Sequence, residues 1–207
     1  MQQSVIRKIL QDKNGFIWIA TEDGLQRFDG YSFKVYRKKL NINSLNWNHI
    51  YCMQEDEKTG LLWLGTAFNG INILNPATDS IVHISETIKE GGLIDRNITC
   101  ISILPKQVIA GNKKGVSIIN NGTYKVEKNI ATKSEVRNIY YDSLSSQTLI
   151  FCKDGETLLL DKMFTTIRSY SSEDFFRLKQ TDIWEVSRTK NGLFWFCTKQ
   201  GLYTADL

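Results

Sequence analysis

The chain has 207 residues, of which 42% are hydrophobic and 23% are charged, with a formal net charge of +4. These values are typical of a globular protein, and the scattered basic residues lack the density of a nucleic-acid-binding stripe. No apolar run reaches the ~18–20 residues of a membrane-spanning helix, and the first residues do not resemble a signal peptide. The chain is therefore either cytoplasmic or cut from a longer secreted protein.

The first predicted unit covers residues 5–36 and consists of four short strands joined by turns. Its first turn is Asp12-Lys13-Asn14-Gly15, and its second strand is Phe16-Ile17-Trp18-Ile19-Ala20-Thr21. Glycine and asparagine tolerate the positive φ angles that tight hairpins need. Short strands rich in β-branched and aromatic residues, separated by such turns, predict an antiparallel sheet.

The same unit recurs along the chain. The second strand has a strong copy at 61–66, weaker copies at 108–112 and 149–153, and another strong copy at 193–198. We align Trp18, Trp63, Ile109, Ile150 and Trp195, which gives steps of 45, 46, 41 and 45 residues. This period is typical of propeller blades. The further units are predicted at 49–84, 97–126, 135–170 and 182–207.

The repeats predict an all-β fold, a β-propeller of four-stranded antiparallel blades that forms one domain over residues 1–207. The last unit stops at Leu207, within its third strand. We therefore expect about four and three-quarter blades, part of a seven-bladed ring. An open end leaves unpaired strand edges, which favours association with another chain. No segment sustains helical apolar spacing, which excludes an α-helical solenoid.

The large residue of each second strand is expected to fill the space between blades. Trp18, Trp63 and Trp195 are thus predicted core residues. A small residue follows each aligned position by two: Ala20, Gly65, Gly111, Cys152 and Cys197. Alternating large and small side chains allow adjacent sheets to approach closely.

The segment Gln11–Gly30, QDKNGFIWIATEDGLQRFDG, resembles the two-component regulator propeller repeat, and residues 43–50 with 55–78 resemble a second copy. The fifth unit resembles a truncated third copy, whereas units three and four keep only the outline and lack the tryptophan. The resemblance implies the periplasmic sensor region of Bacteroidetes hybrid two-component systems. In that family two propellers and an immunoglobulin-like domain precede a membrane helix and a histidine kinase, and many members respond to glycan fragments.

The function that the resemblance implies is ligand sensing, with an oligosaccharide as the expected ligand. Expected partners are the rest of the sensor chain, a second propeller or a second copy, with membrane contact only through regions absent from this chain. No enzymatic activity is expected of this chain, and any kinase activity would lie outside it. Two alternatives stay open: a propeller enzyme of the polysaccharide lyase or hydrolase type, and a protein-interaction scaffold.

Candidate catalytic and metal-binding groups are few. His49 and His83 fall at unrelated positions of different units, and no HExxH, GxSxG or Walker-type motif is present. The four cysteines, at 52, 100, 152 and 197, contain no CxxC pair. We therefore predict no catalytic residue, no metal and no cofactor, and interpret the cysteines as buried free thiols.

The long loops between units are the expected ligand-binding region, because function tends to reside on long loops held by a rigid scaffold. These loops and those between second and third strands emerge on the same face. The candidate ligand-binding residues are Trp47, Asn48, Arg96, Asn97, Glu22, Asp23, Asn69, Lys113 and Lys114. Trp47 and Arg96 could together hold a sugar, with an aromatic face and a polar group. In the alternative interpretation, Trp47 packs beneath its own loop.

Overall fold

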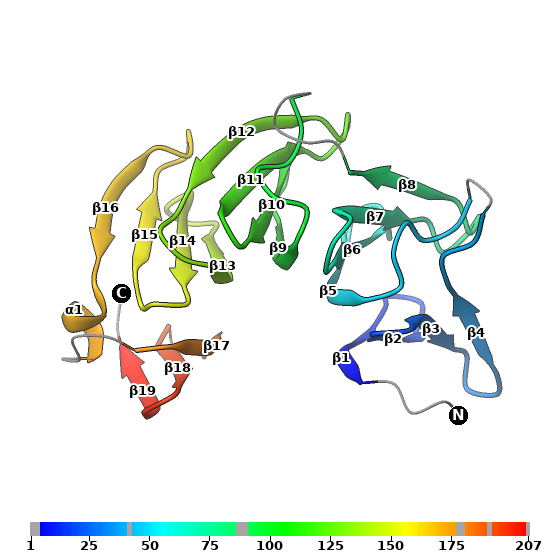
Figure 1. Cartoon of the computed structure of the whole chain (residues 1–207), viewed down its shortest axis with the longest axis horizontal. Helices are drawn as coiled ribbons and strands as arrows, with labels where there is room; N and C mark the ends of the chain where they lie inside the picture. Colours follow the sequence, from blue (N-terminus) through cyan, green and yellow to red (C-terminus); the bar gives the residue numbers. More distant parts are fainter. Residues whose placement is uncertain (1–4, 41–42, 86–90, 177–180, 190–191, 206–207) are drawn as a thin grey trace.

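The structure, a computed structural model, describes residues 5–40, 43–85, 91–176, 181–189 and 192–205. Its strands form five antiparallel sheets that follow one another along an arc, each pairing strands in chain order (Figure 1). The all-β class and the four-stranded antiparallel blade agree with the sequence prediction. No helix among the described residues is long and apolar enough to cross a membrane.

Four blades contain four strands each. The first has β1 (Ile6–Gln11), β2 (Ile17–Thr21), β3 (Gly24–Phe28) and β4 (Phe33–Tyr36). The second has β5 (Ile50–Glu55), β6 (Leu62–Thr66), β7 (Ile71–Leu74) and β8 (Ile81–Ile84). The third has β9 (Ile98–Ile103), β10 (Gln107–Asn112), β11 (Gly115–Asn120) and β12 (Val126–Ala131). The fourth has β13 (Val136–Asp142), β14 (Gln147–Cys152), β15 (Thr157–Leu160) and β16 (Thr166–Tyr170).

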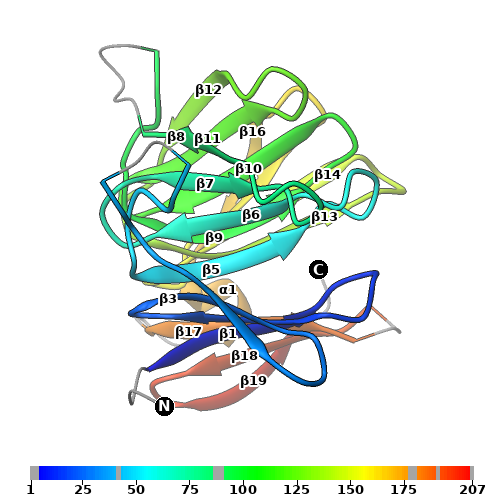
Figure 2. The same cartoon turned by 90° about the vertical axis from the view of Figure 1, so that its right-hand side faces the viewer.

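The fifth blade contains β17 (Ile183–Arg188), β18 (Phe194–Thr198) and β19 (Gly201–Ala205). The expectation of about four and three-quarter blades of a seven-bladed ring is wrong, because the structure shows five blades. The three strands pair as a sheet of their own, and Phe194 and Phe196 pack against Phe151 of the fourth blade, with ring centroids 5.5 Å apart in both pairs. In Figure 2 the first and fifth blades occupy the same end of the molecule.

The spaces between blades hold the hydrophobic core. Trp18 is fully buried between the first two blades, and its indole N–H donates to the Asp12 carboxylate at 2.7 Å. Trp63 is fully buried against the third blade, beside Ile98. Trp195 contradicts the prediction of a core residue, since it is 38% exposed. Its side of β18 faces away from the fourth blade, and no described sheet packs there.

The strand pairing corrects the alignment of the fourth unit. Tyr140 pairs with Leu149, as Leu10 pairs with Trp18 in the first blade, so Leu149 and not Ile150 occupies the tryptophan position. The position two residues later, which holds a small residue in the first three blades, is then Phe151 rather than Cys152. The shift arises because the strand is an unbroken apolar run, in which sequence alone does not distinguish the two faces.

Small residues are essential where the second strands of two blades meet the next sheet. A Cβ atom on Gly65 would lie 2.6 Å from Ile98, and one on Gly111 would lie 2.8 Å from Val136. Each glycine also faces a thiol, that of Cys52 or Cys100, at 2.4–2.5 Å from the added atom. These contacts confirm the predicted role of small residues at 65 and 111.

Two loops between blades differ from the prediction. The third unit was expected to end at residue 126, but its last strand, β12, spans Val126–Ala131, because Tyr124 has a positive φ of 59° in a tight turn closed on Asn120. The loop before the fifth blade contains a short helix, α1 (Ser172–Phe176), that the sequence did not predict.

Candidate functional site

A β-bulge interrupts the innermost strand of every blade. In each of β1, β5, β9, β13 and β17 one residue is skipped in the pairing with the neighbouring strand. The skipped residues are Arg7, Tyr51, Thr99, Arg137 and Trp184. Bulges redirect side chains and are frequent beside functional sites. Here they occur at one equivalent position around the whole arc.

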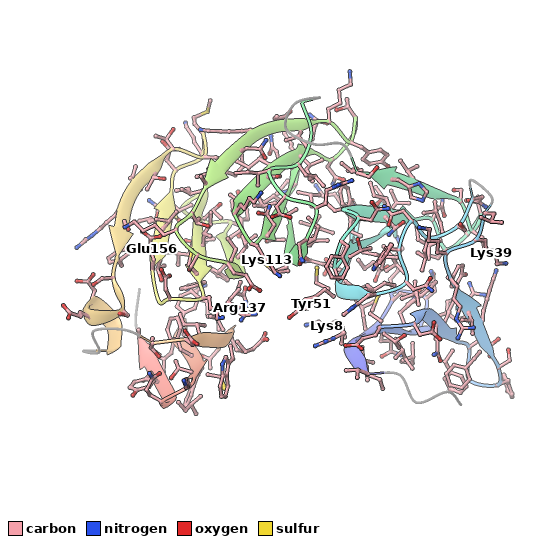
Figure 3. All side chains as sticks on the ribbon, viewed as in Figure 1. Lys8, Lys39, Tyr51, Lys113, Arg137 and Glu156 are labelled. Atoms are coloured by element: carbon pink, nitrogen blue, oxygen red, sulfur yellow. The ribbon has the colours of Figure 1, made fainter. Side chains whose placement is uncertain are left out.

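The five bulged residues line a single pocket on the axis that the inner strands surround. Its volume is about 520 Å³, within the range of small-molecule sites. The residues that follow the bulges also line it, and they are Lys8, Cys52, Cys100, Asn138 and Glu185. Figure 3 shows Lys8 and Tyr51 on one side of the central opening and Arg137 on the other. We call this the axial pocket.

On the side of the first two blades, four side chains form a connected cluster. The guanidinium of Arg7 pairs with the Glu22 carboxylate and lies over the Tyr51 ring, 5.1 Å from its centroid. The His49 ring stacks on Tyr51 at 6.0 Å, and its Nε2 is 3.7 Å from Glu22. Burial lowers the pKa of His49, against the opposing effect of Glu22, which favours the neutral imidazole. The cluster thus holds Arg7 and Tyr51 at the pocket wall.

On the opposite side, Arg137 is held by Glu135, whose carboxylate accepts a hydrogen bond from Nη1 at 3.0 Å. Its Nε–H is buried and has no hydrogen-bond partner among the described residues. Thr99 donates its hydroxyl to the Val136 carbonyl at 2.6 Å, and Asn138 donates its amide to the Val186 carbonyl at 2.8 Å. The bonds of Thr99 and Asn138 tie neighbouring blades together. Arg137 keeps one buried donor, its Nε–H, without a partner among the described residues.

Two of the sequence-predicted site residues, Glu22 and Asp23, lie in the turn between β2 and β3. Glu22 contacts the pocket residue Arg7, so this predicted residue lies beside the axial pocket. Asp23 pairs instead with Arg37, Oδ2 to Nη2 at 2.5 Å, in the loop to the second blade. The structure therefore divides these two neighbours between different clusters.

Trp47 and Asn48 belong to the same loop. The half-buried Trp47 ring meets Phe68 edge-on at 5.8 Å, and the Lys38 ammonium lies 5.0 Å from its centroid. Asn48 stabilises the loop backbone. Its main-chain carbonyl accepts a hydrogen bond from Gly24 N at 2.9 Å, and its side-chain oxygen accepts one from Lys38 N at 2.6 Å. Trp47 thus contacts Lys38 of its own loop and Phe68 of the loop between β6 and β7.

The remaining predicted site residues lie on the loops of the second and third blades. Asn69 exchanges hydrogen bonds with Asn46 at 2.6 and 3.1 Å. The Arg96 carbonyl accepts from Gly70 N at 2.8 Å while its side chain is exposed. Asn97 donates its backbone N–H to Asp95 at 2.8 Å, and the Lys114 ammonium lies 3.9 Å from the same carboxylate.

Lys113 is exposed, and Figure 3 shows it at the inner side of the third blade. The described contacts link most of the nine predicted residues to near neighbours, and no described contact joins Trp47 to Arg96. Their role in ligand binding stays a prediction.

The histidines and cysteines have structural surroundings. The His83 ring is within 2.8 Å of the Ser44 carbonyl oxygen. All four cysteines are free, and burial raises the pKa of Cys52 to about 12. Cys197 is exposed, so the expectation of four buried thiols is wrong for this residue. Among the described residues, no group of three or more His, Cys, Asp or Glu side chains is arranged to hold a metal.

The sequence prediction missed the axial pocket, although a signal for it was present. Each bulged residue directly follows the first apolar residue of an inner strand, as Arg7 follows Ile6 and Arg137 follows Val136. A polar or aromatic residue there interrupts the continuous apolar run expected of a strand that is packed on both faces. The same position in five aligned repeats would have marked a shared surface.

The comparisons with known proteins support the repeat assignment. Residues 1–23 match the family model described as Two component regulator propeller. This match supports the family resemblance noted in the sequence. A histidine kinase, P4, of Formosa agariphila is 51% identical over 37 residues, which are 18% of this chain and 3% of that protein.

Solved structures show the fold. The extracellular domain assigned to a hybrid two-component system of B. thetaiotaomicron matches the whole chain with a TM-score of 0.65 and 20% identity. The extracellular domain assigned to a one-component system of the same organism matches it with a TM-score of 0.73 and 19% identity. The WD40 propeller domain of Doa1 matches 99% of it, with a TM-score of 0.70 and 15% identity. The chain spans 34%, 27% and 66% of these three structures.

Proposed function

We propose that this propeller is a ligand-recognition module of an extracytoplasmic two-component sensor, and that its ligand is a carbohydrate bound in the axial pocket. The repeat family supports the sensor role, as does the fold shared with the extracellular domains of two bacterial signalling proteins. In this proposal the propeller works in the periplasm, and the rest of the sensor chain or a second propeller transmits the signal.

The observation that carries the proposal is the convergence of five bulged residues on one pocket. Two of them, Tyr51 and Trp184, offer aromatic faces, and Arg7 and Arg137 offer several hydrogen-bond donors. A sugar presents an apolar ring face and a rim of hydroxyl groups, so aromatic and polar side chains around one cavity are complementary to it. The bulges hold these groups on strands rather than on loops.

The loop residues predicted from the sequence would extend this site. Glu22 already positions Arg7, and Lys113 lies at the inner side of the third blade. In the proposal, Trp47, Asn48, Asn69, Arg96, Asn97, Asp23 and Lys114 contact the outer parts of a longer oligosaccharide.

Isothermal titration calorimetry with a panel of oligosaccharides tests the proposal. We expect one sugar class to bind, and we expect Tyr51→Ala and Trp184→Ala each to weaken binding by about tenfold, which corresponds to ~1.4 kcal/mol. Tyr31→Ala is the matched control, since Tyr31 is 97% exposed and lies outside the pocket. Equal losses for all three variants would contradict an axial site.

The same experiment separates the alternative functions. Release of shortened or unsaturated products from the panel would indicate an enzyme. Absence of any sugar binding, together with capture of a protein partner that Tyr51→Ala does not affect, would indicate an interaction scaffold.

A further inference from the structure

The axial pocket is lined by more positive than negative side chains. Arg7, Lys8 and Arg137 line it, and Glu185 is the one carboxylate among its described lining residues. A cleft lined mainly by one sign of charge concentrates counter-ions of the opposite sign. The formal charge of the pocket wall therefore favours an anionic ligand.

The existing ion pairs do not use up the donors of these cations. A guanidinium carries five N–H donors, and the two arginines each have one described carboxylate partner, Glu22 for Arg7 and Glu135 for Arg137. The buried Nε–H of Arg137 has no partner among the described residues. Lys8 is exposed and takes part in none of the ion pairs of the described chain.

The Nε–H group is buried, so an oxyanion in the pocket would bind the outer N–H groups of the Arg137 guanidinium. The charge-assisted hydrogen bonds formed there are about twice as strong as neutral ones. Lys8 projects from the opposite side of the opening in Figure 3. The two cations thus flank the space in which a ligand would lie.

Building on the function proposed above, we infer that the ligand is a carbohydrate that carries a carboxylate or sulfate group. Arg137 and Lys8 bind the oxyanion, and the rings of Tyr51 and Trp184 contact the sugar. Glu185, on the same strand as Trp184, accepts hydrogen bonds from hydroxyl groups. Neutral sugars would lack the charge-assisted hydrogen bonds to Arg137 and Lys8 and bind more weakly.

Collisional quenching of Trp184 measures the charge of the pocket without any sugar. The Trp184 signal is the difference between the wild-type chain and Trp184→Phe, and iodide is compared with caesium at equal ionic strength. With each quenching constant divided by that of free N-acetyltryptophanamide, we expect iodide to quench Trp184 at least about twofold more strongly than caesium. This ratio should fall towards one in Lys8→Gln and in Arg137→Gln.

Lys39→Gln is the control, because Lys39 is exposed at the outer side of the molecule in Figure 3. It should leave the ratio unchanged, and thermal unfolding of each variant verifies the fold. An equal response to iodide and caesium in the wild-type chain would overturn the inference. So would an equal fall of the ratio in Lys39→Gln and Lys8→Gln.

A second experiment tests the sugar directly with two matched pools. The acidic pool contains oligogalacturonates and chondroitin sulfate oligosaccharides, and the neutral pool contains cello- and galacto-oligosaccharides of the same lengths. We expect the protein to retain only acidic sugars, and we expect Arg137→Gln to reduce retention about tenfold or more. Preferential retention of neutral sugars would overturn the anionic inference but leave the proposed function intact. Retention of neither pool would contradict the proposed function itself.

Discussion

Two positions of the repeat follow opposite rules. The inter-blade position on the second strand carries a large apolar residue in every blade: Trp18, Trp63, Ile109, Leu149 and Trp195. The bulge position on the first strand carries residues of different charge and size: Arg7, Tyr51, Thr99, Arg137 and Trp184. In the first four blades the inter-blade position meets a similar apolar surface, so its chemistry repeats. The bulge positions share one pocket, and each blade contributes a different group to it.

The contrast separates the scaffold from the site. The packing positions hold the sheets in place, and their substitution should change the free energy of unfolding. Apart from the buried Thr99, which ties the third blade to the fourth, the bulge positions lie outside the inter-blade core. Their substitution should change ligand binding with little effect on folding. Substitutions of the same residue type at the two positions test this division.

The largest effect is expected for Trp63→Ala. Trp63 is fully buried, and truncating a buried aromatic residue costs about 3–5 kcal/mol. Chemical denaturation of the two proteins, with the midpoint and slope compared, measures the difference. Trp184→Ala is the matched control, because Trp184 is 55% exposed at a bulge position, and it should change stability by less than about 1 kcal/mol. Equal losses in the free energy of unfolding for the two variants would show that the bulge position stabilises the fold as much as the inter-blade position does.

A smaller loss is expected for Gly111→Ala. The new methyl carbon would lie 2.4 Å from the Cys100 thiol and 2.8 Å from Val136, and such overpacking costs about 1–3 kcal/mol. Gly122→Ala is the control, because the nearest atom to its added Cβ is at 3.6 Å. If overpacking of the new methyl group is the cause, truncating its cross-strand neighbour with Cys100→Ala should recover part of the loss in the double variant. A neutral Gly111→Ala variant would mean that the blades separate more easily than the contacts imply.

The smallest effect concerns the outer rim, where Asp79 of the second blade accepts hydrogen bonds from Lys34 and Tyr36 of the first. The bond from Lys34 is the main reason that the pKa of Asp79 lies below its usual 3.8. The stabilisation is therefore present above pH 3.8 and is lost as the pH falls through the lower folded-state pKa. Because Asp79 is 41% exposed, its contribution should be less than about 1 kcal/mol.

Urea denaturation of wild type and Asp79→Asn between pH 6 and pH 2 measures this contribution. The difference in the free energy of unfolding between wild type and Asp79→Asn should become smaller towards the acid end of this range. A constant difference between the two proteins at all pH values would assign the effect to packing rather than to the charge.

The sequence predicted the fold better than the site, for physical reasons. Buried apolar residues such as Trp18 and Trp63 recur with the blade period, so composition and spacing reveal them. The same logic was wrong for Trp195, since burial depends on a neighbouring sheet and not on the residue itself. It was wrong by one residue at Ile150, because an apolar run does not show which residues face which blade.

The axial pocket could not be predicted from any single repeat. Its residues share no chemical type, so a search for similar residues passes over Thr99 and Trp184 at equivalent positions. A bulge also cannot be recognised from apolar–polar alternation in the sequence, because its extra residue shifts the register by one. The loop candidates were chosen for loop length, and contacts such as Trp47 with Phe68 depend on folding of the whole loop region.

Fluorine NMR of the chain labelled with 5-fluorotryptophan tests the central claim, that the ligand binds at the axis rather than over the outer loops. The sequence contains five tryptophans, and single Trp→Phe variants assign the five signals. On addition of the acidic oligosaccharide pool, the signal of Trp184 should shift while those of Trp47 and the buried Trp18 and Trp63 stay in place. A shift of the Trp47 signal with an unchanged Trp184 signal would contradict the account and assign binding to the loop face.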